Sequence, residues 1–312
     1  MDVLQEEFQY EERFVAFIDI LGFKEIIDDL EVTNNAEKLK SIKSILNFMN
    51  EETEESHYRT DLPILEEKNG VFYESELGHP RMLYVSDCMV ITADGDMNGF
   101  KGMSQKIHKI ITELAIDGFF CRGAITKGKV FHHGNILFGS GYIKAYQLEQ
   151  KAIFPRIIID PDILPFFNLK ESEVPLAPAF YAKADDYYYL KYFTFNHFPP
   201  YLGDWIHYLL IIRNHIKSKI TTQLEKMQTA IGDKQKAAMR KVLDKYEWIA
   251  EEFNRNYDFY LEELRIQQDA EKKEIERLHE IAVNKYNNYS VIHKIKDREL
   301  HPLIRSSDGA WV

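Results

Sequence analysis

The sequence predicts an α+β fold: a ferredoxin-like antiparallel sheet with helices on one face, followed by an appended C-terminal helical region. The first observation is the order of the apolar runs, which read as strand, helix, strand, strand, helix and strand, then a further helix and strand. That order is typical of a ferredoxin-like sheet. The second is the change after Pro199-Pro200, where apolar residues continue at helical spacing alone. We therefore expect one domain at about 1–198 and a helical region at about 199–312.

The first strand is expected at Arg13–Leu21, an apolar and β-branched run that contains one acid, Asp19. Gly22 ends this run, and Phe23–Leu30 has the pattern of a helix start. A second helix follows it. The polar stretch Glu51–Gly70 is then expected to be a loop or an insertion.

The remaining helices are predicted from apolar residues at helical spacing, and the remaining strands from short apolar runs. In order, they are a hairpin of Arg81–Val85 and Cys88–Thr92, a helix over Phe100–Leu114, a strand at Phe119–Phe131, a helix at Gly139–Gln150, a strand at Arg156–Asp160 and a peripheral hairpin within Ala179–Phe195. Beyond the proline pair, helical spacing runs over Trp205–Met227 and Met239–Phe253, and a charged helix is expected from Asp258 to about Asn284.

The composition limits the classes of function. Hydrophobic residues make up 45% of the 312, which supplies a core and excludes global disorder. Acids outnumber bases by 50 to 39, for a net charge of −11. Nonspecific nucleic-acid binding needs clustered Lys and Arg, so we expect no nucleic-acid partner. A nucleotide needs only a local site and is not excluded.

We expect neither a secretion signal nor a membrane span in this sequence. Its N-terminus is acidic and lacks an apolar segment, and the apolar stretch around Trp205–Ile212 is too short to cross a bilayer. We therefore expect a soluble, cytoplasmic protein with no membrane partner. The two cysteines, Cys88 and Cys121, lie in apolar runs without metal-ligand spacing, which indicates buried thiols.

Two acids in strand contexts are the strongest chemical feature. Asp19 interrupts an apolar strand, and Asp87 lies at the tip of the predicted hairpin. Neighbouring central strands would bring both carboxylates together, and a divalent cation between them would relieve their repulsion. The backbone N–H groups of Leu21, Gly22 and Phe23, at the start of a helix, could then hold phosphate oxygens. The alternative is two surface aspartates and a turn glycine.

Four segments together resemble motifs of the class III nucleotidyl cyclases. They are FIDILGF at 17–23, which resembles the first metal motif; YVSDCMVI at 84–91, the second metal-binding hairpin; RGAITKGKVF at 122–131, a strand motif; and LFGSGYIKAYQLE at 137–149, which aligns without gaps on a helix motif. They stand in the family's order and span roughly residues 13–160.

The resemblance implies that Asp19, Asp87 and the carbonyl of Ile20 ligate two Mg²⁺ or Mn²⁺ ions per site. One ion would lower the pKa of the ribose 3′-hydroxyl of a nucleoside triphosphate, and the other would hold the triphosphate. The 3′-oxygen would attack the α-phosphorus, and pyrophosphate would leave. In this family two chains associate head to tail, so the resemblance also implies a homodimer whose sites combine residues of both chains.

This sequence departs from the family at its transition-state groups. The family's Asn falls on Ile143 and its Arg on Gln147, and neither replacement stabilises phosphate charge as Arg does. We expect Arg122 and Tyr146 to substitute as catalytic residues. Two further candidates are Lys127 and Lys144. If no group substitutes, the chain is a catalytically degenerate cyclase-like scaffold that binds a nucleotide or a protein partner and signals through its helices.

The base-reading positions also differ. The family's purine-reading residues fall on Leu83 and Ile136, and apolar side chains do not read a purine edge by hydrogen bonds. The sequence is more similar to the bacterial pyrimidine cyclases of Pycsar anti-phage defence. That resemblance implies CTP or UTP as substrate and a separate effector that responds to the cyclic nucleotide.

Overall fold

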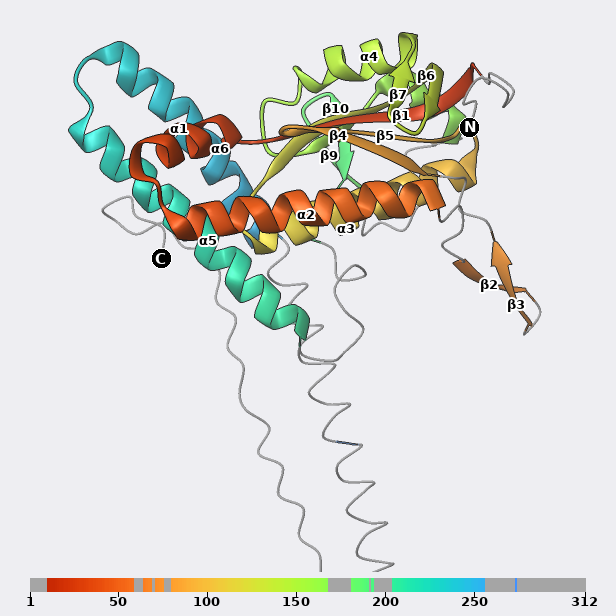
Figure 1. Cartoon of the computed structure of the whole chain (residues 1–312), viewed down its shortest axis with the longest axis horizontal. Helices are drawn as coiled ribbons and strands as arrows, with labels where there is room; N and C mark the ends of the chain where they lie inside the picture. Colours follow the sequence, from red (N-terminus) through yellow and green to blue (C-terminus); the bar gives the residue numbers. More distant parts are fainter. Residues whose placement is uncertain are drawn as a thin grey trace, which may run out of the picture. The chain divides into compact units, whose positions relative to one another are not determined.

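A computed structural model describes residues 10–58, 64–68, 71–75, 80–167, 181–190, 192–193, 204–255 and 273. The chain divides into two compact units, Met1–His197 and Phe198–Val312, and each is described by itself (Figure 1). The assignment of these two units to a cyclase-like domain and a helical region stays a prediction.

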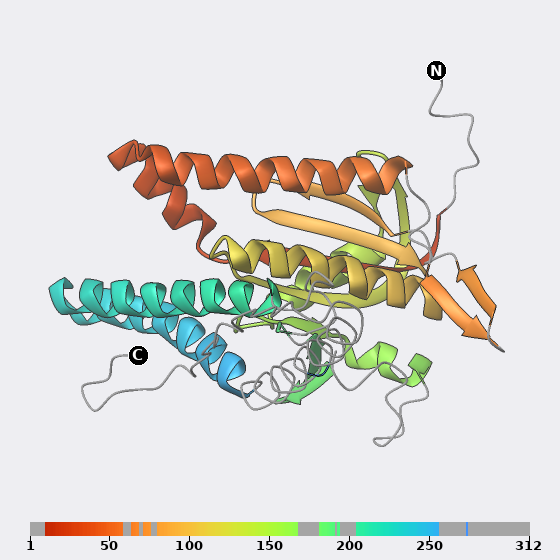
Figure 2. The same ribbon diagram turned by 90° about the horizontal axis from the view of Figure 1, so that it is seen from below.

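The first unit is an α+β fold built on one sheet, as the sequence predicts. The strands run side by side in the order β4-β5-β1-β6-β8-β10-β9, and β7 pairs with β6 off this path (Figures 1 and 2). Their bounds are β1 Glu11–Ile20, β4 Arg81–Val85, β5 Cys88–Asp94, β6 Cys121–His133, β7 Ile136–Phe138, β8 Ile157–Ile159, β9 Tyr181–Ala184 and β10 Tyr187–Leu190. The four strands β4, β5, β1 and β6 are antiparallel neighbours and form the ferredoxin-like centre.

One feature of the sheet differs from the prediction. β8 pairs in parallel with β6, so the sheet is mixed and not wholly antiparallel. The cause is the crossover through α4 (Ser140–Glu149), which returns the chain to the same end of the sheet. The hairpin predicted within Ala179–Phe195 is present as β9–β10 at the edge of this sheet, where β10 pairs with β8 and Tyr189 and Leu190 are buried.

Helices cover both faces of the sheet, so the prediction of helices on one face is wrong. The helices α2 (Ala36–Tyr58) and α3 (Met97–Ile116) lie on one side and α4 on the other (Figure 1). Side chains alternate along a strand, so β1 serves both layers. Phe14 meets Phe100 of α3 with ring centroids 5.2 Å apart. Phe17 and Val15 instead cluster with Ala145 of α4.

Part of the stretch predicted as a loop is regular structure. The helix α1 (Phe23–Thr33) is followed by α2, which continues to Tyr58, and β2 (Ile64–Lys68) pairs with β3 (Val71–Ser75). Glu52 explains the longer helix. Its side chain is buried and forms ion pairs with Lys106 and Lys109 of α3. A hydropathy pattern does not reveal that a charged residue such as Glu52 is buried by pairing with another helix.

The second unit contains a helical hairpin of α5 (Asp204–Thr229) and α6 (Asp233–Arg255), which lie side by side (Figure 2). Its described buried apolar side chains are Leu209, Ile212, Ile216 and Ile220 of α5 and Leu243, Ile249, Ala250 and Phe253 of α6. The predicted charged helix after Asp258 lies outside the described residues, except residue 273. Within the described parts of the chain, no helix has the length and apolar character of a membrane span.

Candidate functional site

Asp19 and Asp87 meet at one end of the sheet. Asp19 ends the β1–β5 pairing opposite Cys88, and Asp87 precedes Cys88 in the β4–β5 turn. The N–H of Ile20 donates to the Asp87 carbonyl over 2.9 Å, which fixes the turn against β1. Ser86, in the same turn, has a φ of 59°. Strand pairing thus places the two predicted metal-ligating carboxylates together.

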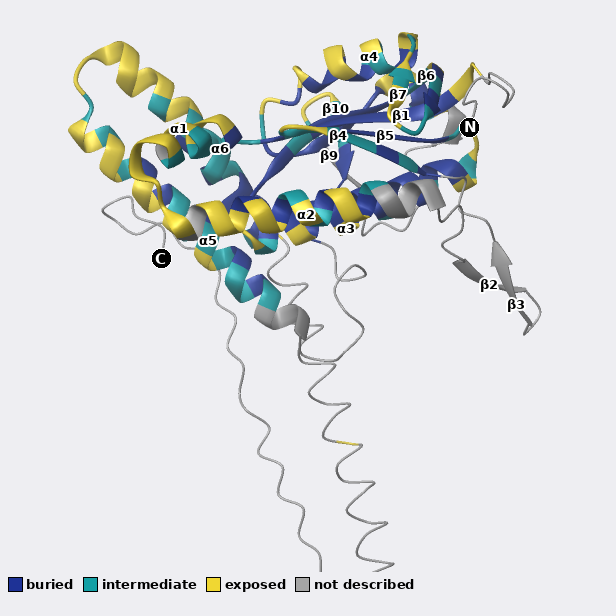
Figure 3. Ribbon diagram, in the orientation of Figure 1, coloured by how far each residue is buried: buried dark blue, intermediate teal, exposed yellow. Residues whose placement is uncertain are grey.

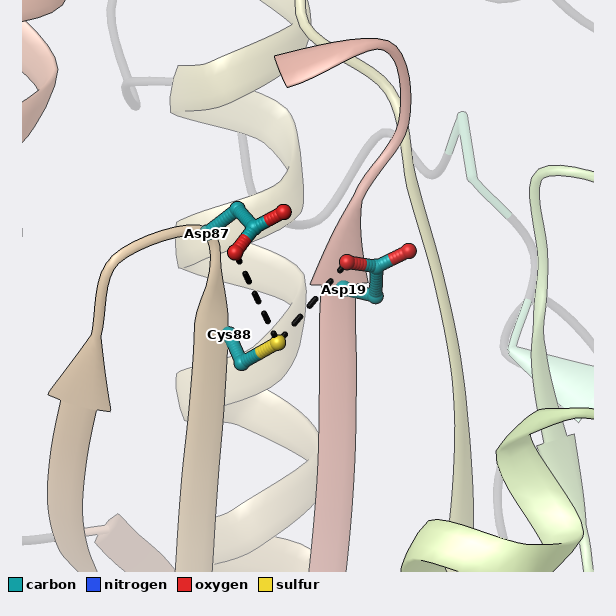
Figure 4. A group of neighbouring side chains, drawn as sticks. All are labelled: Asp19, Asp87 and Cys88. Atoms are coloured by element: carbon teal, nitrogen blue, oxygen red, sulfur yellow. Dashed lines mark hydrogen bonds between the residues drawn. The ribbon is translucent and has the colours of Figure 1, made fainter. Parts of the chain in front are cut away.

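Cys88 completes this cluster, and the sequence interpretation did not include it. Its Sγ lies 3.8 Å from Asp19 Oδ1 and 3.8 Å from Asp87 Oδ1, between the two carboxylates (Figure 4). One ligand atom from each residue lies within 4.8 Å of the others. All three are half-buried. The sequence signal for Cys88 was its place directly after the Ser86-Asp87 turn, because the first residue of β5 pairs with Asp19.

The electrostatics of the cluster favour a cation. Burial raises the pKa of Asp19 above 3.8, Arg122 opposes this rise, and Asp87 adds to it. Burial, together with the charges of Asp19 and Asp87, raises the pKa of the Cys88 thiol to about 12. Each shift means that the site disfavours further negative charge when it holds no cation. A bound divalent cation would reverse that penalty.

Arg122 lies at the edge of this cluster. It pairs with Asp19 across β1 and β6, and its Nε is 3.2 Å from Asp19 Oδ2. The same Nε is 2.7 Å from Oε1 of Glu149, the last residue of α4, whose side chain is buried. Arg122 is therefore tied to two carboxylates of its own chain. Glu149 was not among the predicted site residues.

The turn into α1 is built partly as predicted. Gly22 adopts a left-handed conformation with φ 76°, which glycine accepts without strain, and α1 starts at Phe23. The first-turn N–H groups of such a helix have no partner within the helix. Leu21 differs, because its N–H donates to the Phe120 carbonyl over 2.8 Å. Because the Leu21 N–H already has this partner, the predicted phosphate contact would come from the N–H groups of Gly22, Phe23 and the first turn of α1.

The helix α4 presents an exposed row above the sheet (Figure 3). Ile143, Tyr146 and Gln147 are exposed on it. The Tyr146 ring packs edge-on against Phe17 at 5.3 Å, and Phe17 faces the same side as Asp19. Tyr146 thus lies over β1, the strand that carries Asp19.

The two lysine candidates are placed away from the cluster. Lys144 is held by Asp160 at 2.7 Å and Asp162 at 2.9 Å. Lys127 lies over the ring of Phe14, at 5.5 Å, on the face of the sheet that α3 covers. Neither lysine reaches the acid pair of its own chain.

The predicted base-pocket residues lie on separate strands. Leu83 is half-buried on β4, opposite Val90 of the cluster beneath α4. Ile136 begins β7 and is 49% exposed. Neither side chain offers a hydrogen bond to a base.

Comparisons with known proteins leave the family unassigned. No protein-family model matches the chain, and no curated protein matches it. A crystal structure described as a class III adenylyl cyclase-like ATP-binding protein from Pseudomonas aeruginosa is similar over 52% of this chain, with 11% identity and a TM-score of 0.31. The chain spans only 37% of that protein.

Proposed function

We propose that this chain is a metal-dependent nucleotidyl cyclase, which converts a nucleoside triphosphate into a 3′,5′-cyclic monophosphate and pyrophosphate. The observation that carries the proposal is the meeting of Asp19 and Asp87 beside the start of α1. Carboxylate and carbonyl oxygens are the ligands that Mg²⁺ and Mn²⁺ prefer. Asp19, Asp87 and the Ile20 carbonyl would hold the ions, which when bound activate a ribose hydroxyl and neutralise phosphate charge.

The surrounding residues fit a triphosphate. The N–H groups at the start of α1 would donate hydrogen bonds to its phosphate oxygens, because a helix N-terminus favours anions. Arg122 adds a positive charge next to Asp19. Tyr146 supplies a hydroxyl on the exposed row of α4. We assign Arg122 and Tyr146 as the groups that stabilise charge at the reacting phosphorus.

The substrate is proposed to be CTP or UTP. Leu83 and Ile136 occupy the positions that read a purine in the resembling cyclases, and both are apolar. The likeness to the Pycsar pyrimidine cyclases supports the same choice. It further supports a role as a second-messenger enzyme in anti-phage defence, with a separate effector that reads the product.

A head-to-tail homodimer would complete the site. Apolar side chains are exposed on α4 and β7, where Ile143 is 54%, Ile136 49% and Phe138 44% exposed. Exposed apolar groups of this kind are typical of interfaces. In the resembling family, two chains associate head to tail and each site takes residues from both.

A second candidate is a cyclase-like scaffold that binds a nucleotide or a protein without turnover. The observation that favours it is the exposed row of α4, where Ile143 and Gln147 replace the family's Asn and Arg. Neither side chain carries a charge for the transition state. We rank it second because a site without turnover has no need of both Asp19 and Asp87.

A product assay decides between the two. The full chain is incubated with Mn²⁺ and each of ATP, GTP, CTP and UTP, and cyclic monophosphates are identified by mass spectrometry. We expect a cyclic pyrimidine, and a loss of at least about 100-fold in Asp19→Asn and Asp87→Asn, the scale of one preorganised charged group. Asp186→Asn, in the exposed β9–β10 turn, is the matched control.

Each result has one interpretation. A cyclic purine keeps the cyclase and rejects the pyrimidine assignment. Undiminished product from both aspartate variants rejects the metal site. Nucleotide binding without product in the wild-type chain, retained in both aspartate variants, supports the scaffold.

A further inference from the structure

The thiol of Cys88 lies where a metal ion would be coordinated. Cys88 is the first residue of β5, directly opposite Asp19 of β1. Its Sγ is 3.8 Å from one carboxylate oxygen of Asp19 and 3.8 Å from one of Asp87 (Figure 4). Oxygen-only coordination of Mg²⁺ has no use for a sulfur atom between its two carboxylates.

The two sulfur–oxygen distances are compatible with a tetrahedral metal ion that takes a thiolate ligand. With a Zn–S bond of about 2.3 Å and a Zn–O bond of about 2.0 Å, a tetrahedral ion holds sulfur and oxygen about 3.5 Å apart. The two observed sulfur–oxygen distances of 3.8 Å are close to this value. Thiolate ligands select Zn²⁺ over Mg²⁺ by their softness.

We propose that Asp19, Asp87 and Cys88 form a tight site for a thiophilic divalent cation such as Zn²⁺, which occupies the position of the catalytic ions and inhibits the enzyme. The inhibition that we propose rests on the proposed function. The binding of the cation rests on the geometry alone. On binding, the S–H bond breaks, the metal–sulfur bond forms, and the proton passes to solvent. The fourth tetrahedral position stays open to water.

The second cysteine does not take part. Cys121 is fully buried and pairs with Ile20, so it alternates to the face of the sheet opposite Asp19. The backbone N–H of Cys121 donates to the Tyr192 hydroxyl oxygen over 2.5 Å. Cys88 is therefore the single described thiol at the cluster, and its half-exposed position leaves it open to ions from solvent.

The test uses the full chain with Co²⁺ as a spectroscopic substitute for Zn²⁺. We expect the wild-type protein to show a near-ultraviolet charge-transfer band from thiolate to cobalt, and Cys88→Ser to lose it while Cys121 remains. Zn²⁺ affinity, from competition with Co²⁺, should fall at least about 100-fold in Cys88→Ser, because even outer-shell partners of a metal account for 10–100-fold. Mn²⁺ affinity should change by no more than about 3-fold, because Mn²⁺ prefers oxygen ligands.

Cys88→Ala provides a second variant if the serine form does not fold, which circular dichroism decides. Co²⁺ binding without the band in the wild-type protein overturns the inference and leaves an oxygen-only site, with the proposed function intact. A band that survives in Cys88→Ser also overturns it. A further outcome is that Zn²⁺ binds as expected while the wild-type protein forms no cyclic product from ATP, GTP, CTP or UTP. In that case the proposed function fails and the thiophilic site stands.

Discussion

Arg122 and Glu149 join the helix α4 to the acid pair. Arg122 Nε lies 2.7 Å from Oε1 of Glu149 and 3.2 Å from Oδ2 of Asp19, so one guanidinium connects the end of α4 with the end of β1. The Glu149 side chain is only 4% exposed. The position of α4 is therefore linked to the charge state of the proposed metal site.

Removal of this guanidinium should destabilise the first unit. We expect Arg122→Met to lower the free energy of unfolding by about 3 kcal/mol, because the buried Glu149 carboxylate loses its counter-charge. The double variant with Glu149→Leu should recover part of the loss, since no buried charge then remains. Urea unfolding of the two single variants and the double variant measures the coupling. Additive losses would show that the two residues do not act as a pair.

The hydroxyl of Tyr146 is expected to matter for turnover and its ring for packing. Tyr146→Phe keeps the edge-on contact with Phe17 and should lower kcat about 100-fold, the effect of one donor at a charged transition state. Tyr142→Phe is the control, because Tyr142 also packs on Phe17, at 6.1 Å, one turn earlier in α4. Steady-state kinetics of both variants gives the comparison. Equal rates would remove Tyr146 from the chemistry.

Gly128 should prove essential for the approach of α4 to β6. A Cβ at Gly128 would lie 2.8 Å from Gly141 Cα and 3.2 Å from Gly141 N, and these backbone atoms cannot rotate away. We expect Gly128→Ala to cost about 1–3 kcal/mol of unfolding free energy through overpacking. Lys129→Ala, at the next and exposed position, should cost far less. Denaturant unfolding of the two variants tests this, and equal stability would contradict the close contact.

Glu52 should make the stability of the first unit depend on acid pH. Burial raises the pKa of Glu52, but the charge of Lys106 and the hydrogen bonds from Lys109 and Lys106 outweigh it, and the net pKa lies below the ordinary 4.5. The folded state therefore binds this proton less readily than the unfolded state. The stabilisation is present above pH 4.5 and is lost as the pH falls through the lowered pKa.

The matched variants make this dependence measurable. At pH 7, Glu52→Gln should lower the unfolding free energy by about 3 kcal/mol, because the buried Lys106 ammonium loses its partner. The difference from the wild-type protein should shrink as the pH drops below 4.5, where the wild-type carboxyl also becomes neutral. Glu51→Gln, at the adjacent exposed position, should show neither effect. A pH-independent difference would contradict the assigned ion pairs.

Most strands and helices, and their order, were within reach of the sequence, but β2, β3 and β7 were not predicted. The run at 13–21 is apolar enough to mark a central strand, and the turn at Ser86-Asp87 separates two short apolar runs. Local periodicity fixes such elements, because each reports which side chains face the core. The end of α2 was missed since Glu52 is stabilised by partners on α3, and charge pairing across elements leaves no local pattern.

The sequence by itself determined which acids stand in strand contexts, Asp19 and Asp87, and that the positions of Ile143 and Gln147 carry no charge. Only the tertiary structure decided that these acids meet, that Cys88 lies between them and that Arg122 is shared with Glu149. It also decided that α4 covers the opposite face from α3. The physical reason is register: strand pairing sets which side chains are neighbours, and pairing joins residues that are remote in the chain.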